Sequence, residues 1–408
     1  MKYTSMILLL LVLFVVLGIS AQGAVKPDDF LSRKGAKLYM HGREYRAIGV
    51  NVPHLHQAYI GTWLHIPMKY GTNEKAKQAI VDAILDAQKS RIAFIRFFAS
   101  PGYPRDIEMS YMKDREAYWK SMDELVALCR EHNVKLVPSL NVVMWHSIEN
   151  FDEPRQAILD PNSKTYKAAY GYIREFVTRY KDEPTILMWE LLNEGMLASD
   201  VDMKDSKGLP RECYPADWTR EQKILSREDS FTWAMWLRIY KEQTAFIKSL
   251  DPNHLVTSGD AGTRQECTSR RETFPDFKYW NDTLRESIAN NLASQPEPLD
   301  VYSYHIYGSN KKPEEMLNWM RDISRATQAT ESPVFIGELG QWDPSFDKDP
   351  QGKWARQAID LMEKEQVSLA ALWVWHFNWQ PDLTFTSESQ PALVKRAGDF
   401  NKRWAGLK

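Results

Sequence analysis

The feature that most constrains the fold is an alternation of short apolar runs with longer amphipathic segments, which begins near residue 45 and continues to the C-terminus. Short apolar runs bounded by turn residues predict β-strands. Eight strands are predicted, at residues 45–51, 92–98, 134–140, 186–190, 254–258, 300–305, 334–338 and 369–375. Eight strands alternating with helices indicate an α/β fold, a (β/α)8 TIM barrel with enlarged βα loops. A doubly wound open sheet is the alternative.

Amphipathic helices are predicted between these strands because apolar residues recur there at helical spacing. The first helix carries such a face at Ala76, Ile80, Ala83, Ile84 and Ala87. Similar patterns occupy residues 115–132, 164–180, 231–250, 282–293, 313–327, 353–365 and 393–404. No repeat or low-complexity linker divides the chain, so a single domain is predicted over residues 24–408.

The residues before the first predicted strand carry two further signals. Residues 31–44 contain turn signals at Gly35 and Gly42 and predict an N-terminal hairpin that caps the barrel bottom. Before them, Lys2 is followed by an almost wholly aliphatic stretch at 6–19 and then by small residues. This order predicts a signal peptide over residues 1–23, and an uncleaved anchor is the alternative. The mature protein is expected to be secreted, to leave the membrane after cleavage and to be a monomer.

Composition excludes several classes of function. The chain has 408 residues and a net charge of −2, which gives no reason to expect nucleic acid as a partner. Three Cys residues exclude a disulfide scaffold; Cys129 is predicted to be buried, whereas Cys213 and Cys267 could pair. His54 and His56 lack a neighbouring carboxylate or Cys at metal-binding spacing, so no metal and no cofactor are expected.

Polar residues at the ends of the predicted strands indicate one site. The carboxyl ends of barrel strands meet at one rim, where active sites of this fold lie. Arg96 is the most informative of these residues, because it lies among Ile95, Phe97 and Phe98 and an unpaired buried charge costs several kcal/mol. It therefore needs a carboxylate partner. The residues at this rim are Asn51, Arg96, Asn141, Asn193, Glu194, Asp260, His305, Tyr307, Glu338 and Trp375.

Two carboxylates with a neighbouring cation match the requirements of glycoside hydrolysis with retention. Glu194 would stay protonated and donate to the leaving oxygen, and Glu338 would attack the anomeric carbon. Arg96 is expected to keep Glu338 ionised. The apolar setting and the like-charged neighbour are expected to raise the pKa of Glu194. Tyr307 would hold the second oxygen of Glu338, Asn193 would reach the sugar 2-hydroxyl, and the carboxyl groups would lie about 5 to 5.5 Å apart.

The sequence Trp189-Glu190-Leu191-Leu192-Asn193-Glu194 resembles the Asn-Glu motif of clan A glycoside hydrolases, and the chain most resembles family 5, which includes cellulases and β-mannanases. The resemblance implies an acid/base at Glu194, a nucleophile at Glu338 and a Trp375 ring stacked under the sugar. Alternation along the last strand would turn Trp373 and Trp375 to the same side. Further matches are Gly49-Val50-Asn51, Arg96, Asp251-Pro252-Asn253-His254, His305-Ile306-Tyr307, Gly337-Glu338 and Trp375.

The third strand departs from many family 5 endoglucanases, which carry a His at its exit. Asn141 stands there instead and resembles the mannanase side of the family, although His146 could serve in place of that His. The expected substrate is a β-1,4-linked polysaccharide or oligosaccharide, with β-mannan ahead of cellulose. An endo-β-1,4-glucanase and an exo-acting β-glycosidase are the alternatives. The insertion at residues 196–229 is expected to wall the cleft.

A rival of another class is a catalytically silent carbohydrate-binding barrel. The presence of Glu194, Glu338 and Arg96 weighs against it, because a site that only binds gains nothing from two mutually repelling acids.

Overall fold

The computed structural model describes residues 25–61, 69–100, 111–112, 114–141, 151, 153–202, 212–213, 223–224, 229–276, 278–308, 313–341 and 352–407. The predicted signal peptide and His146 lie outside these residues, as does most of the insertion at 196–229. Within the insertion, the described elements are η3 (Gly195–Ala198) and a two-stranded ribbon of β8 (Glu212–Cys213) and β9 (Lys223–Ile224).

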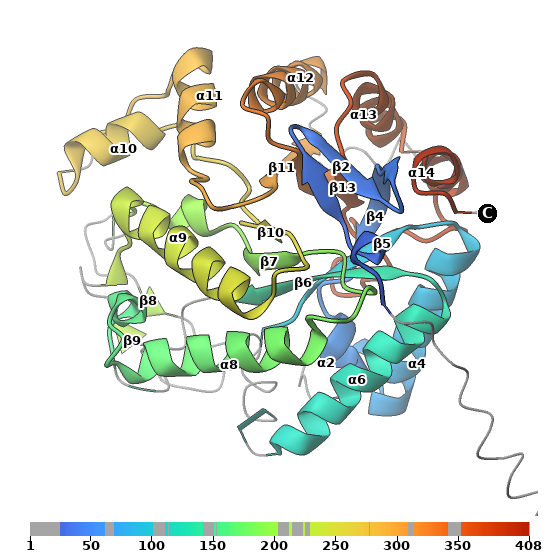
Figure 1. Ribbon diagram of the computed structural model, residues 1–408. Coiled ribbons are helices and arrows are strands. Elements are labelled where there is room, and N and C mark those ends of the chain that lie inside the picture. The colour runs from blue at the N-terminus through green and yellow to red at the C-terminus, as the bar shows by residue number, and fades with distance from the viewer. Residues whose placement is uncertain are drawn as a thin grey trace, which may run out of the picture.

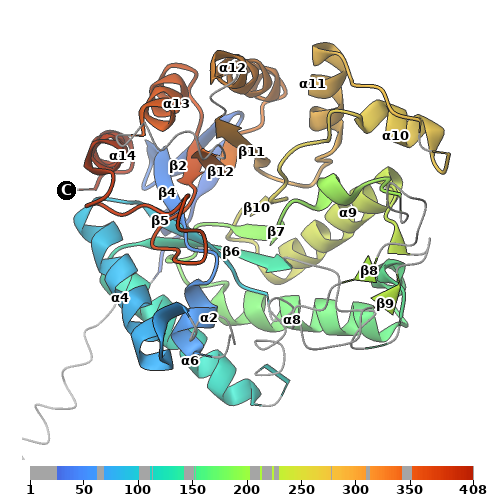
Figure 2. The same ribbon diagram turned by 180° about the vertical axis from the view of Figure 1, so that it is seen from behind.

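Eight strands form one sheet in which every neighbouring pair is parallel. The order is β10-β7-β6-β5-β4-β13-β12-β11, and a bridge between Thr257 and Val301 joins the two ends of the sheet. The predicted barrel is thus confirmed, and the open-sheet alternative is wrong (Figures 1 and 2). The strands are β4 (Ala47–Asn51), β5 (Phe94–Phe98), β6 (Lys135–Asn141), β7 (Trp189–Leu192), β10 (Val256–Thr257), β11 (Tyr302–Gly308), β12 (Val334–Gln341) and β13 (Leu369–Leu372).

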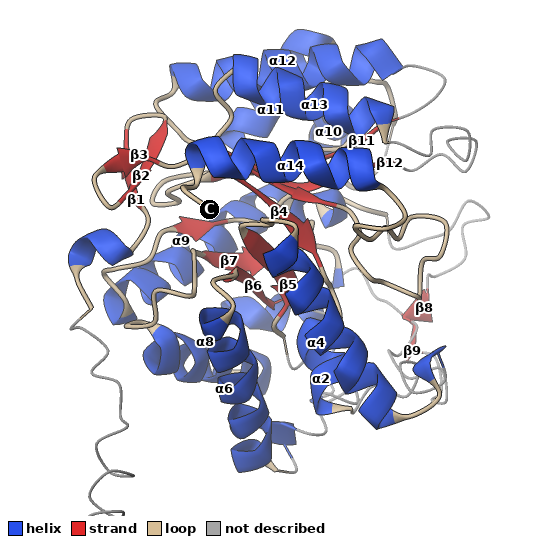
Figure 3. Ribbon diagram, turned by 90° about the vertical axis from the view of Figure 1, so that its right-hand side faces the viewer, coloured by secondary structure: helices blue, strands red, loops and turns tan. Residues whose placement is uncertain are grey.

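Helices surround the strands on the outside (Figure 3). The first long helix buries the face that its sequence predicts, from Ala76 to Ala87, and begins where the Thr72 side chain accepts a hydrogen bond from the amide of Lys75. The helices are α2 (Leu55–Ile60), α4 (Asn73–Lys89), α6 (Arg115–Glu131), η2 (Arg155–Leu159), α8 (Lys164–Tyr180), α9 (Trp233–Leu250), α10 (Cys267–Thr273), α11 (Leu284–Ala293), α12 (Pro313–Ala329), α13 (Lys353–Lys364) and α14 (Pro391–Trp404).

A small antiparallel sheet covers the amino-terminal end of the barrel. It contains the predicted hairpin, β1 (Ser32–Lys34) and β2 (Lys37–Met40), and a third short strand, β3 (Arg43–Glu44). Leu38 and Met40 pack there with Phe94, Phe335 and residues at the start of other barrel strands. The cap closes the end of the barrel opposite the strand exits and leaves the exits for the site.

The described cysteines are not cross-linked. Cys129 and Cys267 are both free and buried, so the pairing of Cys267 with Cys213 is not formed. His54 and His56 are buried too, and their Nε2 atoms contact Tyr70 and Ser121. Among the described residues, no helix has both the length and the apolar character needed to cross a membrane.

Candidate active site

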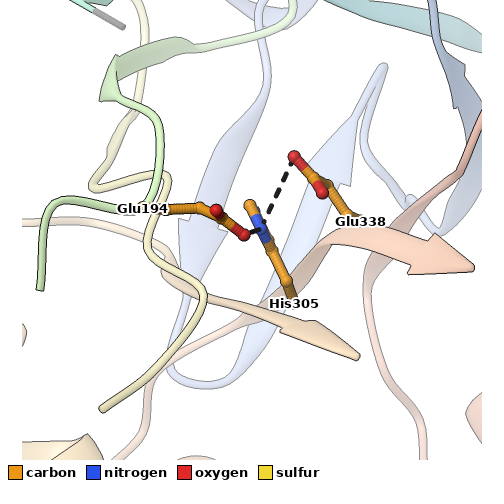
Figure 4. Close-up of side chains that lie close together, drawn as sticks. All are labelled: Glu194, His305 and Glu338. Atoms are coloured by element: carbon orange, nitrogen blue, oxygen red, sulfur yellow. Dashed lines mark hydrogen bonds and ion pairs between the residues drawn. The ribbon is translucent and has the colours of Figure 1, made fainter. Parts of the chain in front are cut away.

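Three side chains from strand ends converge at the carboxyl end of the barrel (Figure 4). Glu338 lies in β12, His305 lies opposite it in β11, and Glu194 follows β7. One ligand-type atom from each of the three lies within 4.8 Å of the others. The residues come from positions more than 30 apart in sequence and meet because parallel barrel strands end at one rim.

Arg96 is the centre of the polar network. Its side chain is fully buried in β5, and its guanidinium lies 2.9 Å from Glu338 Oε1 and 2.8 Å from Glu190 Oε1. It also donates to Asn51 Oδ1 at 3.0 Å and to Asn193 Oδ1 at 2.6 Å. Burial alone would lower the pKa of Arg96, but the two carboxylates reverse this and raise it above its usual range. Arg96 therefore stays positively charged.

The two asparagines have different positions around this arginine. Asn51 is buried, and its amide also donates to Gly337 O at 3.0 Å and to Ala371 O at 3.1 Å. Asn51 therefore connects four strands, β4, β5, β12 and β13, beneath the site. Asn193 offers its oxygen to Arg96, which leaves its NH2 group as the donor that a ligand could use.

Glu338 receives a donor on each oxygen. Arg96 contacts Oε1, and the Tyr307 hydroxyl donates to Oε2. Burial first, and then the charge of Glu338, raise the pKa of Tyr307 well above its usual value, so the phenol keeps its proton. Both donors stabilise negative charge on Glu338.

Glu194 has a different environment. Its backbone is left-handed, with φ 56° and ψ 35°, and its side chain is 32% exposed. Burial raises the pKa of Glu194, while Arg96 and Arg264 oppose that shift. The expected direction of the shift is thus found, but the expected contribution of a like-charged neighbour is not among its causes. Glu338 is already compensated by Arg96, which explains its small influence.

His305 joins the two acids. Its Nδ1 lies 2.8 Å from Glu194 Oε1 and 3.6 Å from Glu338 Oε1. Burial lowers the pKa of His305 to about 4, so near neutral pH the ring is uncharged and the contact with Glu194 is a hydrogen bond rather than an ion pair. These three groups could ligate a metal ion, but the guanidinium of Arg96 on Glu338 already supplies the positive charge there.

Comparison with known proteins identifies the family. The protein-family model named cellulase, glycosyl hydrolase family 5, matches residues 56–378. The chain belongs to glycosyl hydrolase family 5. It is therefore an O-glycosyl hydrolase, and the family's substrates are β-linked polysaccharides.

Two plant relatives match most of the length of this family 5 hydrolase. Mannan endo-1,4-β-mannosidase 8 from Oryza sativa subsp. japonica is 24% identical over 337 residues, 75% of this chain and 78% of the relative. Mannan endo-1,4-β-mannosidase 2 from Arabidopsis thaliana is 24% identical over 386 residues, 85% of this chain and 78% of the relative. The endo-1,4-β-mannanase from Rhizomucor miehei shares the fold, with a TM-score of 0.63 and 17% identity, covering 92% of this chain and 99% of that one.

The position of Trp375 in this family 5 hydrolase corrects the sequence prediction. Trp375 is fully buried in the core, and its Nε1 donates to Ala83 O in α4 at 3.0 Å. It cannot stack on a sugar. The expectation that Trp373 and Trp375 share a side assumed a continuous strand, but β13 ends at Leu372 and strand alternation does not extend beyond it.

Trp373 lies near Tyr307 instead. It is half-buried, and its Nε1 donates to Gln380 Oε1 at 2.9 Å. A Cβ added to Gly340 would lie 2.7 Å from the Tyr307 ring and 3.0 Å from the Trp373 Cβ. Trp373 therefore lies close to Tyr307, which is the donor to Glu338.

The remaining site predictions have mixed outcomes. Asn141 ends β6 and pairs with Leu192 of β7, but its side chain lies outside the described residues, as does the whole of His146.

Glu190 was not among the predicted site residues. It is a fully buried charge within an apolar strand, the same signal that singled out Arg96, and it is one of the carboxylate partners that Arg96 requires.

Proposed function

We propose that this family 5 hydrolase is a secreted, retaining endo-β-1,4-mannanase. The observation that carries the reaction type is the approach of Glu194 and Glu338, which have carboxylate oxygens within 4.8 Å of each other. Retaining glycosidases place their two acids about 5 to 5.5 Å apart, whereas inverting enzymes separate them by about 6.5 to 9.5 Å to admit water. The substrate follows from the plant relatives, which are named as mannan endo-β-mannosidases.

In the proposed mechanism, Glu338 attacks the anomeric carbon while Glu194 protonates the departing glycosidic oxygen. Glu194 then removes a proton from water, which hydrolyses the glycosyl-enzyme bond and restores Glu338. In both steps His305 is a hydrogen-bond partner of Glu194, and because its ring is uncharged it adds no positive charge beside Glu194. We assign Trp373 as the ring under the sugar, Asn193 as the 2-hydroxyl donor, and Asn141 as a further sugar contact.

The proposal also covers the ends of the chain. We propose residues 1–23 as a signal peptide and residues 24–408 as one catalytic domain that acts as a monomer. Amino-terminal sequencing of exported protein tests the signal peptide. Cleavage between residues 21 and 24 is expected, and retention of Met1 would indicate an anchor.

A substrate panel tests the proposed function. Mannan is expected to be cleaved fastest, with an early fall in viscosity, and carboxymethylcellulose and xylan slowly or not at all. Proton NMR of the first product is expected to show the β-anomer. Preference for carboxymethylcellulose would favour the endoglucanase alternative, and early release of small sugars the exo-acting one. Binding of mannan without hydrolysis would support the silent carbohydrate-binding barrel.

Glu194→Ala is expected to act selectively. Without its acid, kcat/KM for mannan is expected to fall by roughly 10² to 10⁴-fold. For a dinitrophenyl β-mannoside, whose leaving group needs no proton, kcat/KM is expected to fall by less than about 10-fold. Equal losses on both substrates would contradict the acid assignment. Glu175→Ala, a partly exposed glutamate paired with Arg115, serves as the control expected to leave both values unchanged.

The alkaline side of the pH profile is expected to depend on the same group. Burial raises the pKa of Glu194, so its protonated form persists to higher pH than that of an exposed glutamic acid. The kcat/KM for mannan is expected to fall as pH rises through this value. The fall is expected to vanish for the dinitrophenyl substrate, and an identical alkaline limb for both substrates would assign the titration to another group.

A further inference from the structure

Asp260 is a buried carboxylic acid next to the site that the proposed mechanism does not use. It follows β10 and is fully buried. Its Oδ1 accepts a hydrogen bond from the Met196 amide at 2.8 Å. The Tyr240 hydroxyl of α9 faces the carboxyl without meeting it in a well-formed hydrogen bond, and Oδ2 has no partner among the described residues. Such a group is costly to bury and needs an explanation.

The contact with Met196 lies two residues beyond Glu194, in the segment that gives Glu194 its left-handed backbone. On the other side, the amide of Glu194 donates to Gly259 O at 3.0 Å. Gly259 has φ 79°, and a Cβ there would lie 1.8 Å from Leu192 O, so the two segments are in direct contact. Glu194 is therefore held from both sides by residues 259 and 260. A non-glycine residue with positive φ persists when its surroundings fix it.

The electrostatic surroundings favour an uncharged Asp260. The titratable groups that face it are Glu190 from β7, Glu194, Tyr240 from α9 and Tyr302 from β11. Burial raises the pKa of Asp260 to about 7; the Met196 amide and Tyr240 oppose this shift, and Glu194 and Glu190 add to it. The carboxyl is thus uncharged in mildly acidic solution, and its ionisation would add a negative charge next to Glu194.

We propose that Asp260 is a positioning residue for this glycosidase, whose buried carboxyl fixes the backbone that aims Glu194. The inference rests on the proposed role of Glu194 as acid/base. No bond of the substrate is made or broken by Asp260. The hydrogen bond from Met196 needs an oxygen acceptor but no ionisable group, so an amide in place of the carboxyl can preserve it.

Two variants test the role of this oxygen. Asp260→Asn keeps an oxygen for Met196 and cannot ionise. Its kcat/KM for mannan at pH 5 is expected to stay within about threefold of wild type, because the acceptor for the Met196 amide is retained. Asp260→Ala loses the oxygen, and kcat/KM for mannan is expected to fall on the order of 10²-fold, as for a displaced catalytic group. The dinitrophenyl β-mannoside is expected to be affected less.

A second measurement needs no catalysis. A carboxyl whose folded pKa is raised from about 4 to about 7 makes the folded protein bind more protons than the unfolded chain in that window, so stability falls as pH rises. Asp260→Asn removes this fall. Between pH 4 and pH 8, the Tm of the variant is therefore expected to rise relative to that of wild type. Tyr302→Phe, which removes a buried hydroxyl facing Asp260, is the control expected to leave this Tm difference unchanged.

The outcomes are distinct. A loss of kcat/KM for mannan in Asp260→Asn as large as that in Asp260→Ala would overturn the proposal, because the oxygen that accepts from the Met196 amide would then not matter. Equal losses on mannan and dinitrophenyl β-mannoside in Asp260→Ala would overturn the positioning role. If Glu194→Ala kept wild-type activity on mannan, the proposed function would fail, and the Tm comparison would still test the ionisation of Asp260.

Discussion

Glu338→Ala is expected to lower kcat by roughly 10⁴-fold or more on every glycoside substrate, because it removes the group proposed to form the covalent intermediate. The loss is expected to extend to substrates with activated leaving groups, which distinguishes it from Glu194→Ala. The fold is expected to survive. Arg96 would still lie 2.8 Å from the Glu190 carboxylate and within reach of Asn51 and Asn193, so its buried charge stays paired.

The measurement is kcat on mannan and on dinitrophenyl β-mannoside, with thermal unfolding of the same samples. Glu365→Ala is the matched control, since Glu365 is also a buried carboxylate paired with an arginine, Arg325, but lies at the end of α13 away from the site. Its kcat is expected to be unchanged even if its Tm falls. Release of sugar by Glu338→Ala at the wild-type rate would remove the nucleophile assignment.

The barrel was predictable because its strands and helices carry strong apolar patterns. Every predicted strand is found, with ends displaced by a few residues: the fourth was predicted at 186–190 and is observed as β7, Trp189–Leu192. Because the barrel is closed, the carboxyl ends of its strands meet at one rim. This is why Arg96, Glu194, His305 and Glu338, which are far apart in sequence, could be placed in one cluster.

Details that depend on three-dimensional packing were not predictable. The resemblance to family 5 places the sugar-stacking ring on a tryptophan of the last strand, and the sequence predicts that strand as far as Trp375, but the chain leaves the sheet after Leu372. Arg96 was expected to need a carboxylate, but the sequence could not show that it needs two, Glu190 and Glu338, since this depends on the register between β5, β7 and β12. The cause of the pKa shift of Glu194 likewise depends on which charges are already compensated.

Arg96→Leu is expected to be the most destabilising substitution in the site. It leaves two buried carboxylates, Glu190 and Glu338, without their cation, and the expected loss is about 3 to 5 kcal/mol in the free energy of unfolding. Turnover is expected to vanish as well, because Glu338 loses the Arg96 donor that holds its Oε1. Arg96→Lys is expected to restore little, since a single ammonium cannot reach four acceptors in a fixed planar arrangement.

Urea unfolding at two pH values distinguishes this explanation from a simple packing defect. Protonation of the two unpaired carboxyl groups removes the unfavourable charges, so Arg96→Leu is expected to be closer to wild type at pH 4 than at pH 7. A packing defect would give the same difference at both. Arg325→Leu, which breaks a pair whose arginine is 58% exposed, is expected to cost less than Arg96→Leu. An equally small cost for Arg96→Leu would show that the buried cation is dispensable to the fold.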